Sequence, residues 1–284
     1  MRSMLSRLLV LFLFASVAVT ARVPDEFDAY LFVEGEVSVS DHGRVTAHRI
    51  DTEVEPQIKA LVDRVITQWL FEPVQLDGTA AAFTSNMRVT LHGQAKHGEL
   101  IVRVEHVEFT GSNVVREGTS MDRSIRATHI QPPRFPLDAM RAGLQGRTMV
   151  ALRVDRYGQV IDAAVSHTDL VGLSKSEKVL ARARAPLERA ALSALRQWRF
   201  ELSEHAIPEG RSETSVLVPV FYSMSKRSGD KGWFEPGRWS YVTMGRKQRI
   251  DWLGQNEIAA TLGANGAGST LPVKLLEPTD DAAL

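Results

Sequence analysis

Residues 131–160, QPPRFPLDAMRAGLQGRTMVALRVDRYGQV, and residues 187–200, LERAALSALRQWRF, decide the fold of this 284-residue chain. Three prolines restrict the opening residues to extended conformations, and a short helix is expected at Leu137–Ala142, ended by Gly143. A β-hairpin follows, with glycine supplying a positive φ in the turn at Asp155–Gly158. The second stretch is an amphipathic helix. None of these residues has the pattern of a catalytic site, so they predict binding rather than catalysis.

An earlier stretch repeats this pattern. When Trp69 is aligned with Trp198, apolar residues precede both at the same helical offsets. Each stripe follows a hairpin with glycine in its turn, Gly43 or Gly158, and precedes another strand. We therefore expect an α+β fold of two small domains, each an antiparallel sheet with a helix packed on one face, and both tryptophans in the cores. The stripes are Ile58, Leu61, Val62, Val65, Ile66 and Trp69, and Leu187, Ala190, Ala191, Ala194, Leu195 and Trp198.

The two units differ in length between glycine and tryptophan. Gly43 and Trp69 are 26 positions apart, whereas Gly158 and Trp198 are 40 apart, a difference of 14. We expect this insertion, within Leu170–Ala185, to be peripheral because lengthening a loop has a small thermodynamic cost. Proline is tolerated in the first turn of a helix, so the helices are expected to start near Pro56 and Pro186.

The N-terminus has the pattern of a signal peptide. A basic region with Arg2 and Arg7 precedes the apolar run Leu8–Val19, and small residues suited to cleavage end at Ala21. The run is shorter than the about 20 residues that a membrane-spanning helix needs. We therefore expect cleavage and export, and the alternative is an uncleaved inner-membrane anchor.

Composition excludes several classes of function. The formal net charge is zero, which gives no electrostatic reason to expect nucleic acid as a partner. There is no cysteine, hence no disulfide, thiolate nucleophile or cysteine metal site. The histidines His92, His97 and His106 lack zinc-motif spacing, and Asp41 and Asp155 lie in turns, where carboxylates usually bond their own backbone. We expect no enzyme activity, catalytic residue, metal, cofactor or small-molecule substrate.

The expected organisation has five parts. Residues 1–21 form the signal peptide, and residues 22–111 form the first domain, with strands at Asn86–His92 and Glu99–Phe109. Residues 112–128 form a polar linker. Residues 129–224 form the second domain, whose last strand is Thr214–Tyr222. Residues 225–284 form a polar, partly flexible tail with Gly263–Ser269 as its most flexible part, although Trp233, Trp239 and Trp252 suggest that it docks somewhere.

In order along the chain, several features resemble the C-terminal domain of TonB-type energy transducers. They are the proline-rich segment, Ala139, two glycines, the hairpin with an Asp-x-x-Gly turn and the helix ending in Trp-Arg-Phe. The resemblance covers about Gln131–Tyr222, and the first unit resembles a degenerate copy without the proline-rich segment, so that the two form a tandem repeat. No single piece is specific, but the ordered set is.

This resemblance implies a periplasmic protein-binding module. Such domains bind an extended segment of an outer-membrane receptor or another envelope protein by strand addition at a sheet edge. Val216, Leu217, Val218 and Val220 lie in the strand to which such a segment would add, and Pro219, which cannot donate to a ladder, fits an edge strand. The expected partner-binding residues are Gln131, Pro132, Pro133, Phe135, Pro136, Val216, Leu217, Val218 and Val220.

The sequence also departs from the family pattern. Phe135 stands where tyrosine is usual, the proline-rich segment is one residue longer, and Leu202 replaces a proline. The chain has no long proline-rich spacer such as could cross the periplasm. Energy transduction across the periplasm needs such a tether, so a membrane-anchored energy transducer for outer-membrane transport is the alternative function and not the leading one. The sequence leaves open whether the two units pack together or exchange strands in a homodimer.

Overall fold

The computed structural model describes residues 26–76, 78–96, 99–115, 124–172, 176–207, 210–224, 234–253, 260–261, 267–269, 273 and 275–276. The expected signal peptide, residues 1–21, lies outside them. The fold is α+β with mostly antiparallel sheets, as the sequence predicts. Within the described residues, no helix combines the length and apolar character that crossing a membrane requires.

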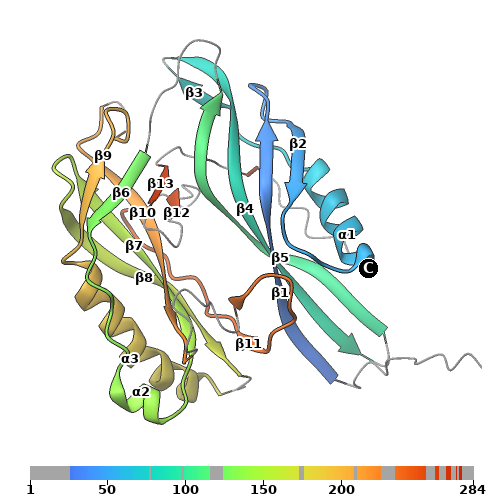
Figure 1. The fold of residues 1–284 in the computed structure, drawn as a ribbon, viewed down its shortest axis with the longest axis vertical. Helices are drawn as coiled ribbons and strands as arrows, with labels where there is room; N and C mark the ends of the chain where they lie inside the picture. The colour runs from blue at the N-terminus through green and yellow to red at the C-terminus, as the bar shows by residue number, and fades with distance from the viewer. Residues whose placement is uncertain are drawn as a thin grey trace, which may run out of the picture.

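The first half of the chain forms one antiparallel sheet with a helix on one face (Figure 1). Its elements are β1 (Glu26–Val39), β2 (Val45–Ile50), α1 (Pro56–Thr67), β3 (Val74–Leu76), β4 (Thr79–Lys96) and β5 (Glu99–Val115). The strand order is β2–β1–β4–β5, and β3 pairs with β4. Helix α1 begins with Pro56, as expected, and buries its apolar stripe against alternate residues of β1, β4 and β5.

The second half has a related arrangement. Its elements are β6 (Ser124–His129), α2 (Leu137–Arg141), β7 (Gly146–Asp155), β8 (Val160–Val171), α3 (Glu177–Leu195), β9 (Arg199–Leu202) and β10 (Glu213–Tyr222). The order β8–β7–β10 matches β2–β1–β4 in the first half, and α3 packs on one face of this sheet.

The core of the second half lies between α3 and this sheet. Leu187 and Leu195 of the helix are fully buried there, and alternate residues of β7 and β10 face them. This alternation follows from the two-residue period of a strand, which directs every second side chain to the same face. The strand residues in this core are Val150, Leu152 and Val154 of β7, and Val216, Val218, Val220 and Tyr222 of β10.

Matching backbone contacts join hairpin and helix end in the two halves. The amide of Phe71 donates to the carbonyl oxygen of Gly43 at 2.8 Å, and the amide of Phe200 donates to that of Gly158 at 2.9 Å. Both glycines have positive φ, 77° and 75°. Trp69 and Trp198 are 2% and 7% exposed, so the predicted burial of both tryptophans is confirmed.

The C-terminal tail, defined here as residues 234–276, is bound to both halves. Its strands are β11 (Val242–Thr243), β12 (Ala260–Thr261) and β13 (Ala267–Ser269). On one side of the molecule, Ser240 bridges to Tyr30 of β1 and β11 pairs with β8. On the other side, β12 lies between β10 and β5, parallel to both, and thereby links the sheets of the two halves into one ten-stranded sheet. The tail therefore connects the two sheets along both sides.

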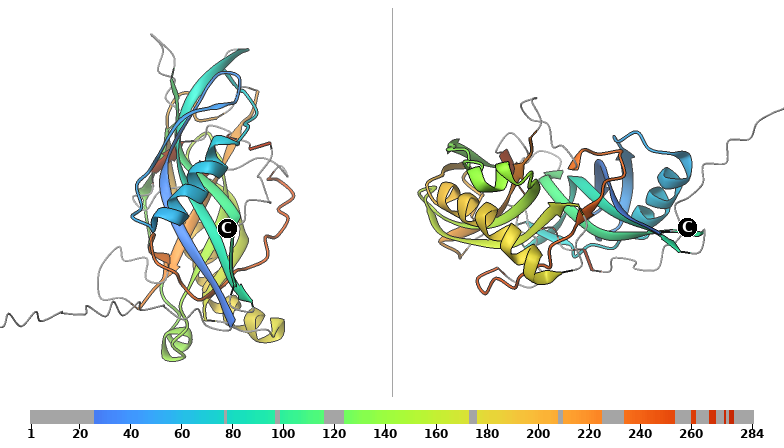
Figure 2. Two further views of the ribbon diagram at one scale, coloured as in Figure 1. Left: turned by 90° about the vertical axis from the view of Figure 1, so that its right-hand side faces the viewer. Right: turned by 90° about the horizontal axis from the view of Figure 1, so that it is seen from below.

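The two sheets lie between the two long helices. Figures 1 and 2 show α1 and α3 on opposite outer sides, with the strands between them. The sheet faces that carry no helix point toward each other, because Arg147 of β7 contacts Glu108 of β5 and lies 5.9 Å from the ring centroid of Phe32 of β1. The layers thus run helix, sheet, sheet, helix.

Several local expectations were wrong. Pro186 lies inside α3 rather than near its start, because the helix begins nine residues earlier at Glu177 and continues the apolar stripe through the buried Leu180. The insertion is not wholly peripheral, since Leu170 and Leu180 both belong to the core. Strands β4 and β5 are 18 and 17 residues long, well beyond the predicted bounds.

Two expected irregular segments contain strands. Strand β5 extends to Val115 and β6 starts at Ser124, so both enter the span in which a polar linker was expected. Ile125 of β6 is 1% exposed. Part of the tail segment expected to be flexible forms β13, which pairs with β6, while residues 262–266 lie outside the described residues. Trp239 packs against the core of the first half, and the ring centroid of Trp252 lies 5.7 Å from the guanidinium carbon of Arg153. Trp233 lies outside the described residues.

Candidate protein-binding site

The proline-rich segment, residues 131–136, contacts the core of the second half at both of its ends. At one end the Trp198 indole Nε1 donates to the carbonyl oxygen of Gln131 at 3.0 Å. At the other, the ring of Phe135 packs edge-on against that of Tyr222, with centroids 5.4 Å apart. Gln131 and Pro132 are exposed, and Pro133 and Pro136 are half-buried. The segment is therefore extended and held in place, with its first residues open to solvent.

Strand β10 has alternating buried and half-buried residues. Val216, Val218 and Val220 are at most 7% exposed and face α3. Their side chains belong to the protein's own core, so a partner could reach only their main chain. Leu217 and Phe221 lie on the opposite face. Contact between Phe135 and Tyr222 brings the proline-rich segment to the C-terminal end of this strand.

The two edges of β10 have different neighbours. One edge pairs with β7 over all ten residues, from Glu213 opposite Asp155 to Tyr222 opposite Gly146. On the other edge, β12 pairs only with Val216 and Leu217. In the described part of the chain, no strand pairs with this second edge from Val218 to Tyr222.

Pro219 indicates which main-chain groups face the second edge. It lies opposite Met149 of β7 and has no amide hydrogen to donate to that strand. A proline fits this ladder when its nitrogen points away from β7. By the two-residue period of a strand, the main-chain groups of Leu217 and Phe221 then point the same way.

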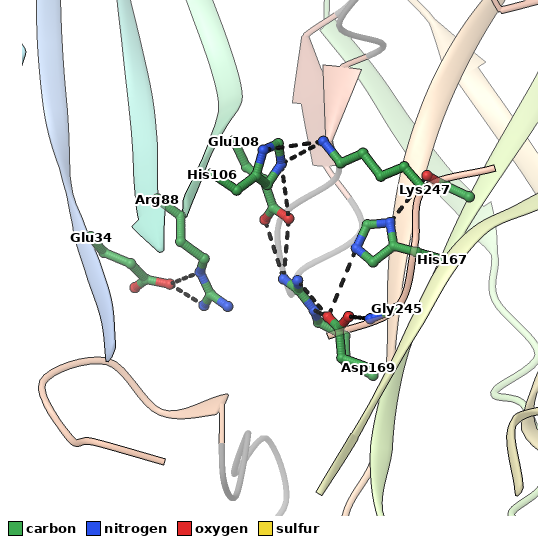
Figure 3. Close-up of polar contacts among 10 residues, drawn as sticks. Glu34, Arg88, His106, Glu108, His167, Asp169, Gly245 and Lys247 are labelled. Atoms are coloured by element: carbon green, nitrogen blue, oxygen red, sulfur yellow. Dashed lines mark hydrogen bonds and ion pairs between the residues drawn. The ribbon is translucent and has the colours of Figure 1, made fainter. Parts of the chain in front are cut away.

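A cluster of charged side chains, which no sequence pattern predicted, lies between the two sheets. We call it the ion cluster: His106 and Glu108 of β5, Arg147 of β7, His167 and Asp169 of β8, and Lys247 of the tail (Figure 3). Its centre is Arg147, which is 1% exposed. The guanidinium lies 2.9 Å from an Asp169 carboxylate oxygen and 3.2 Å from a Glu108 carboxylate oxygen.

The ion cluster joins three parts of the chain. Arg147 and Asp169 come from the second sheet and Glu108 from the first, and the amide of Gly245 in the tail donates to Asp169 at 2.8 Å. Phe32 and Phe234 lie beside the guanidinium of Arg147, with ring centroids 5.9 and 5.7 Å away. A separate pair, Glu34 and Arg88, links β1 to β4 within the first sheet.

Burial and charge shift the pKa values of the ion cluster in different directions. Burial alone would raise the pKa of Glu108, but the nearby Arg147 guanidinium lowers it to about 2. Burial would lower the pKa of Arg147, but Glu108 and Asp169 raise it above its usual value. Burial, together with the charge of Lys247, lowers the pKa of His106 to about 4. The centre of the cluster is thus a buried ion pair beside a neutral histidine.

The described residues contain no group of three or more side chains that could hold a metal ion. His92 is 8% exposed and its ring stacks on that of Tyr30, with ring centroids 4.6 Å apart, whereas His97 lies outside the described residues. Asp155 behaves as predicted for a turn carboxylate: it accepts hydrogen bonds from the amides of Tyr157 and Gln159 at 2.9 and 2.8 Å.

Part of the chain is similar to TonB. Two curated relatives, each named Protein TonB and from two strains of Xanthomonas campestris pv. campestris, are 31% identical to it over 108 residues. The match covers 38% of this chain and 41% of each relative, so the chain spans about two-fifths of the length of the relatives it matches. No family model and no solved structure matches the chain. These similarities support a TonB-like domain.

Proposed function

We propose that the protein is a non-enzymatic binding module of the periplasm. Its second half, residues 129–224, would bind an extended segment of an outer-membrane receptor or another envelope protein as an added strand at the second edge of β10. The observation that carries the proposal is that edge: from Val218 to Tyr222, no strand pairs with it in the described part of the chain.

The chemistry of a strand edge suits this role. Unpaired main-chain amides and carbonyls bind an extended peptide by ladder hydrogen bonds, with little demand on the peptide's side chains. The core-facing valines of β10 fix the strand in place. The proline-rich segment contacts the end of β10 through Phe135 and Tyr222, and its residues Gln131 and Pro132 are exposed. The similarity to TonB supports the same assignment.

We also propose that the two halves are tandem copies of one unit. Support comes from the shared strand order and from the matched contacts of Gly43 with Phe71 and of Gly158 with Phe200. In the first half, the strand equivalent to β10 is β4, and β5 covers its outer edge almost throughout. The edge of the first half that matches the proposed site is therefore occupied by β5.

The test is capture of outer-membrane proteins from a detergent extract by the purified mature protein. Leu217→Pro removes an amide from the proposed edge and should lower capture at least tenfold, whereas Leu217→Ala keeps the amide and should capture normally. Gln131→Ala should weaken capture if the proline-rich segment takes part. Undiminished capture by both Leu217→Pro and Gln131→Ala would reject the β10 edge.

A membrane-anchored energy transducer is the second candidate, favoured by the name of the relatives and the apolar run at Leu8–Val19. Mass spectrometry of the N-terminus of protein isolated from cells distinguishes the two. A chain that starts at Arg22 supports a cleaved signal peptide and a periplasmic protein. A chain that keeps residues 8–21 supports the anchored transducer.

A further inference from the structure

We propose that β12 is a built-in occupant of the β10 edge, which a partner strand must displace. This inference rests on the proposed function, because it assigns to the tail the control of that site. Ala260 pairs with Val216 and Thr261 with Leu217. Thr261 also pairs with Thr110 of β5. The tail thus uses the same main-chain groups that a longer added strand would need.

Described contacts hold the tail on both sides of β12. Before β12, the guanidinium carbon of Arg153 lies 5.7 Å from the ring centroid of Trp252, and Ile250 is buried at 8% exposed. After it, β13 pairs with β6 and Leu275 bridges to Phe71. Such tethering gives a segment an effective concentration of about millimolar at its site. A free peptide therefore competes with β12 at a disadvantage.

The pairing of β12 is nevertheless short. It covers two residues of β10 and one of β5, against ten for the pairing of β10 with β7. Its contribution to stability is correspondingly small, since each hydrogen bond adds little net free energy in water. A partner that pairs along β10 from Leu217 to Phe221 would gain more ladder bonds than it removes. The tail would then keep segments that form few ladder bonds from binding at the β10 edge.

A peptide added in trans tests this directly. The probe is a synthetic peptide of residues 256–265, NEIAATLGAN. Thr261→Pro removes the β12 amide and should bind this peptide at least tenfold more tightly than wild type. Thr261→Ala keeps the amide and should bind as weakly as wild type. Equal affinity of all three proteins for the peptide would overturn the proposal.

A disulfide lock gives an independent test that does not depend on the proline variant folding. The chain has no cysteine, so Leu217→Cys with Thr261→Cys creates the only pair. The oxidised protein should capture at least tenfold less outer-membrane protein than the same protein after reduction. Equal capture before and after reduction overturns the role of β12 but leaves the proposed function standing. Capture by no variant, reduced or oxidised, rejects the proposed function instead.

Discussion

Gly158 and Phe200 meet through their backbones. A Cβ atom at Gly158 would lie 1.8 Å from the carbonyl oxygen of Phe200, and Gly158 has a φ of 75°. The same relationship joins Gly43 and Phe71, where the distance would be 2.0 Å. In each half, the hairpin turn therefore packs directly on the chain that leaves the helix, with no room for a side chain.

Gly158→Ala should destabilise the protein by more than the about 1–2 kcal/mol that a left-handed conformation costs a residue with a Cβ atom. The matched control is Gly143→Ala, which has a φ of 69° but no atom within 4 Å of the added Cβ. Urea unfolding of the two variants measures the difference. Equal losses would show that the close approach to Phe200 is relieved at no cost.

Trp198→Ala should lower the free energy of unfolding by about 3–5 kcal/mol, as large aromatic truncations in cores do. Trp198→Phe keeps most of the packing but removes the hydrogen bond to Gln131, and should cost about 0.5–1.5 kcal/mol. Faster proteolysis within residues 131–136 in Trp198→Phe would show that the indole holds the proline-rich segment. Wild-type melting of Trp198→Ala would contradict its place in the core.

Arg147→Met should cost about 3–5 kcal/mol, because it leaves the carboxylates of Glu108 and Asp169 buried without a cation. Adding Glu108→Gln and Asp169→Asn to it should restore part of the loss. Arg88→Met is the control: its partner Glu34 has a side chain that is 37% exposed, so the loss should be smaller. Chemical denaturation measures all three, and an equal loss for Arg88→Met would argue against burial as the cause.

Acidification should destabilise the protein through His106. Its pKa is about 4 in the folded state against 6.5 ordinarily, so the unfolded chain binds more protons between these values. Stability should fall as the pH drops from 6.5 to 4, by at most about 2 kcal/mol because a quarter of the side chain is exposed. His106→Gln should flatten the slope, whereas His42→Gln, in an exposed turn, should not. Urea midpoints at pH 7.5 and 4.5 provide the measurement.

Sequence patterns predicted the elements that depend on local periodicity. The stripes ending at Trp69 and Trp198 gave both long helices and their buried faces, and glycine marked both hairpin turns. The predicted start of α3 near Pro186 is wrong, because the buried Leu180 continues the apolar stripe before the proline. One disfavoured residue did not outweigh the burial of a longer apolar face.

The ion cluster and the course of the tail could not be predicted in this way. Glu108, Arg147 and Asp169 come from three strands, and no local spacing relates them. A weak signal existed, because Arg147 lies in a strand that is buried along most of its length, and a charge in such a place needs a partner. The tail has little periodicity, and its position depends on edges that exist only after both sheets have formed.

The bridge between Tyr30 and Ser240 has a consequence for how the protein is made. It joins residues more than two hundred positions apart, and contacts of such separation form late in folding. While the chain emerges from its N-terminus, one edge of β1 near Tyr30 and the edge of β10 at Val216 and Leu217 stay unpaired until the last fifth of the sequence arrives. A molecule cleaved before Ser240 would keep these two stretches of strand edge unpaired, and proteins can assemble edge to edge through such stretches. The integrity of the C-terminus would then decide whether the protein stays single or self-associates.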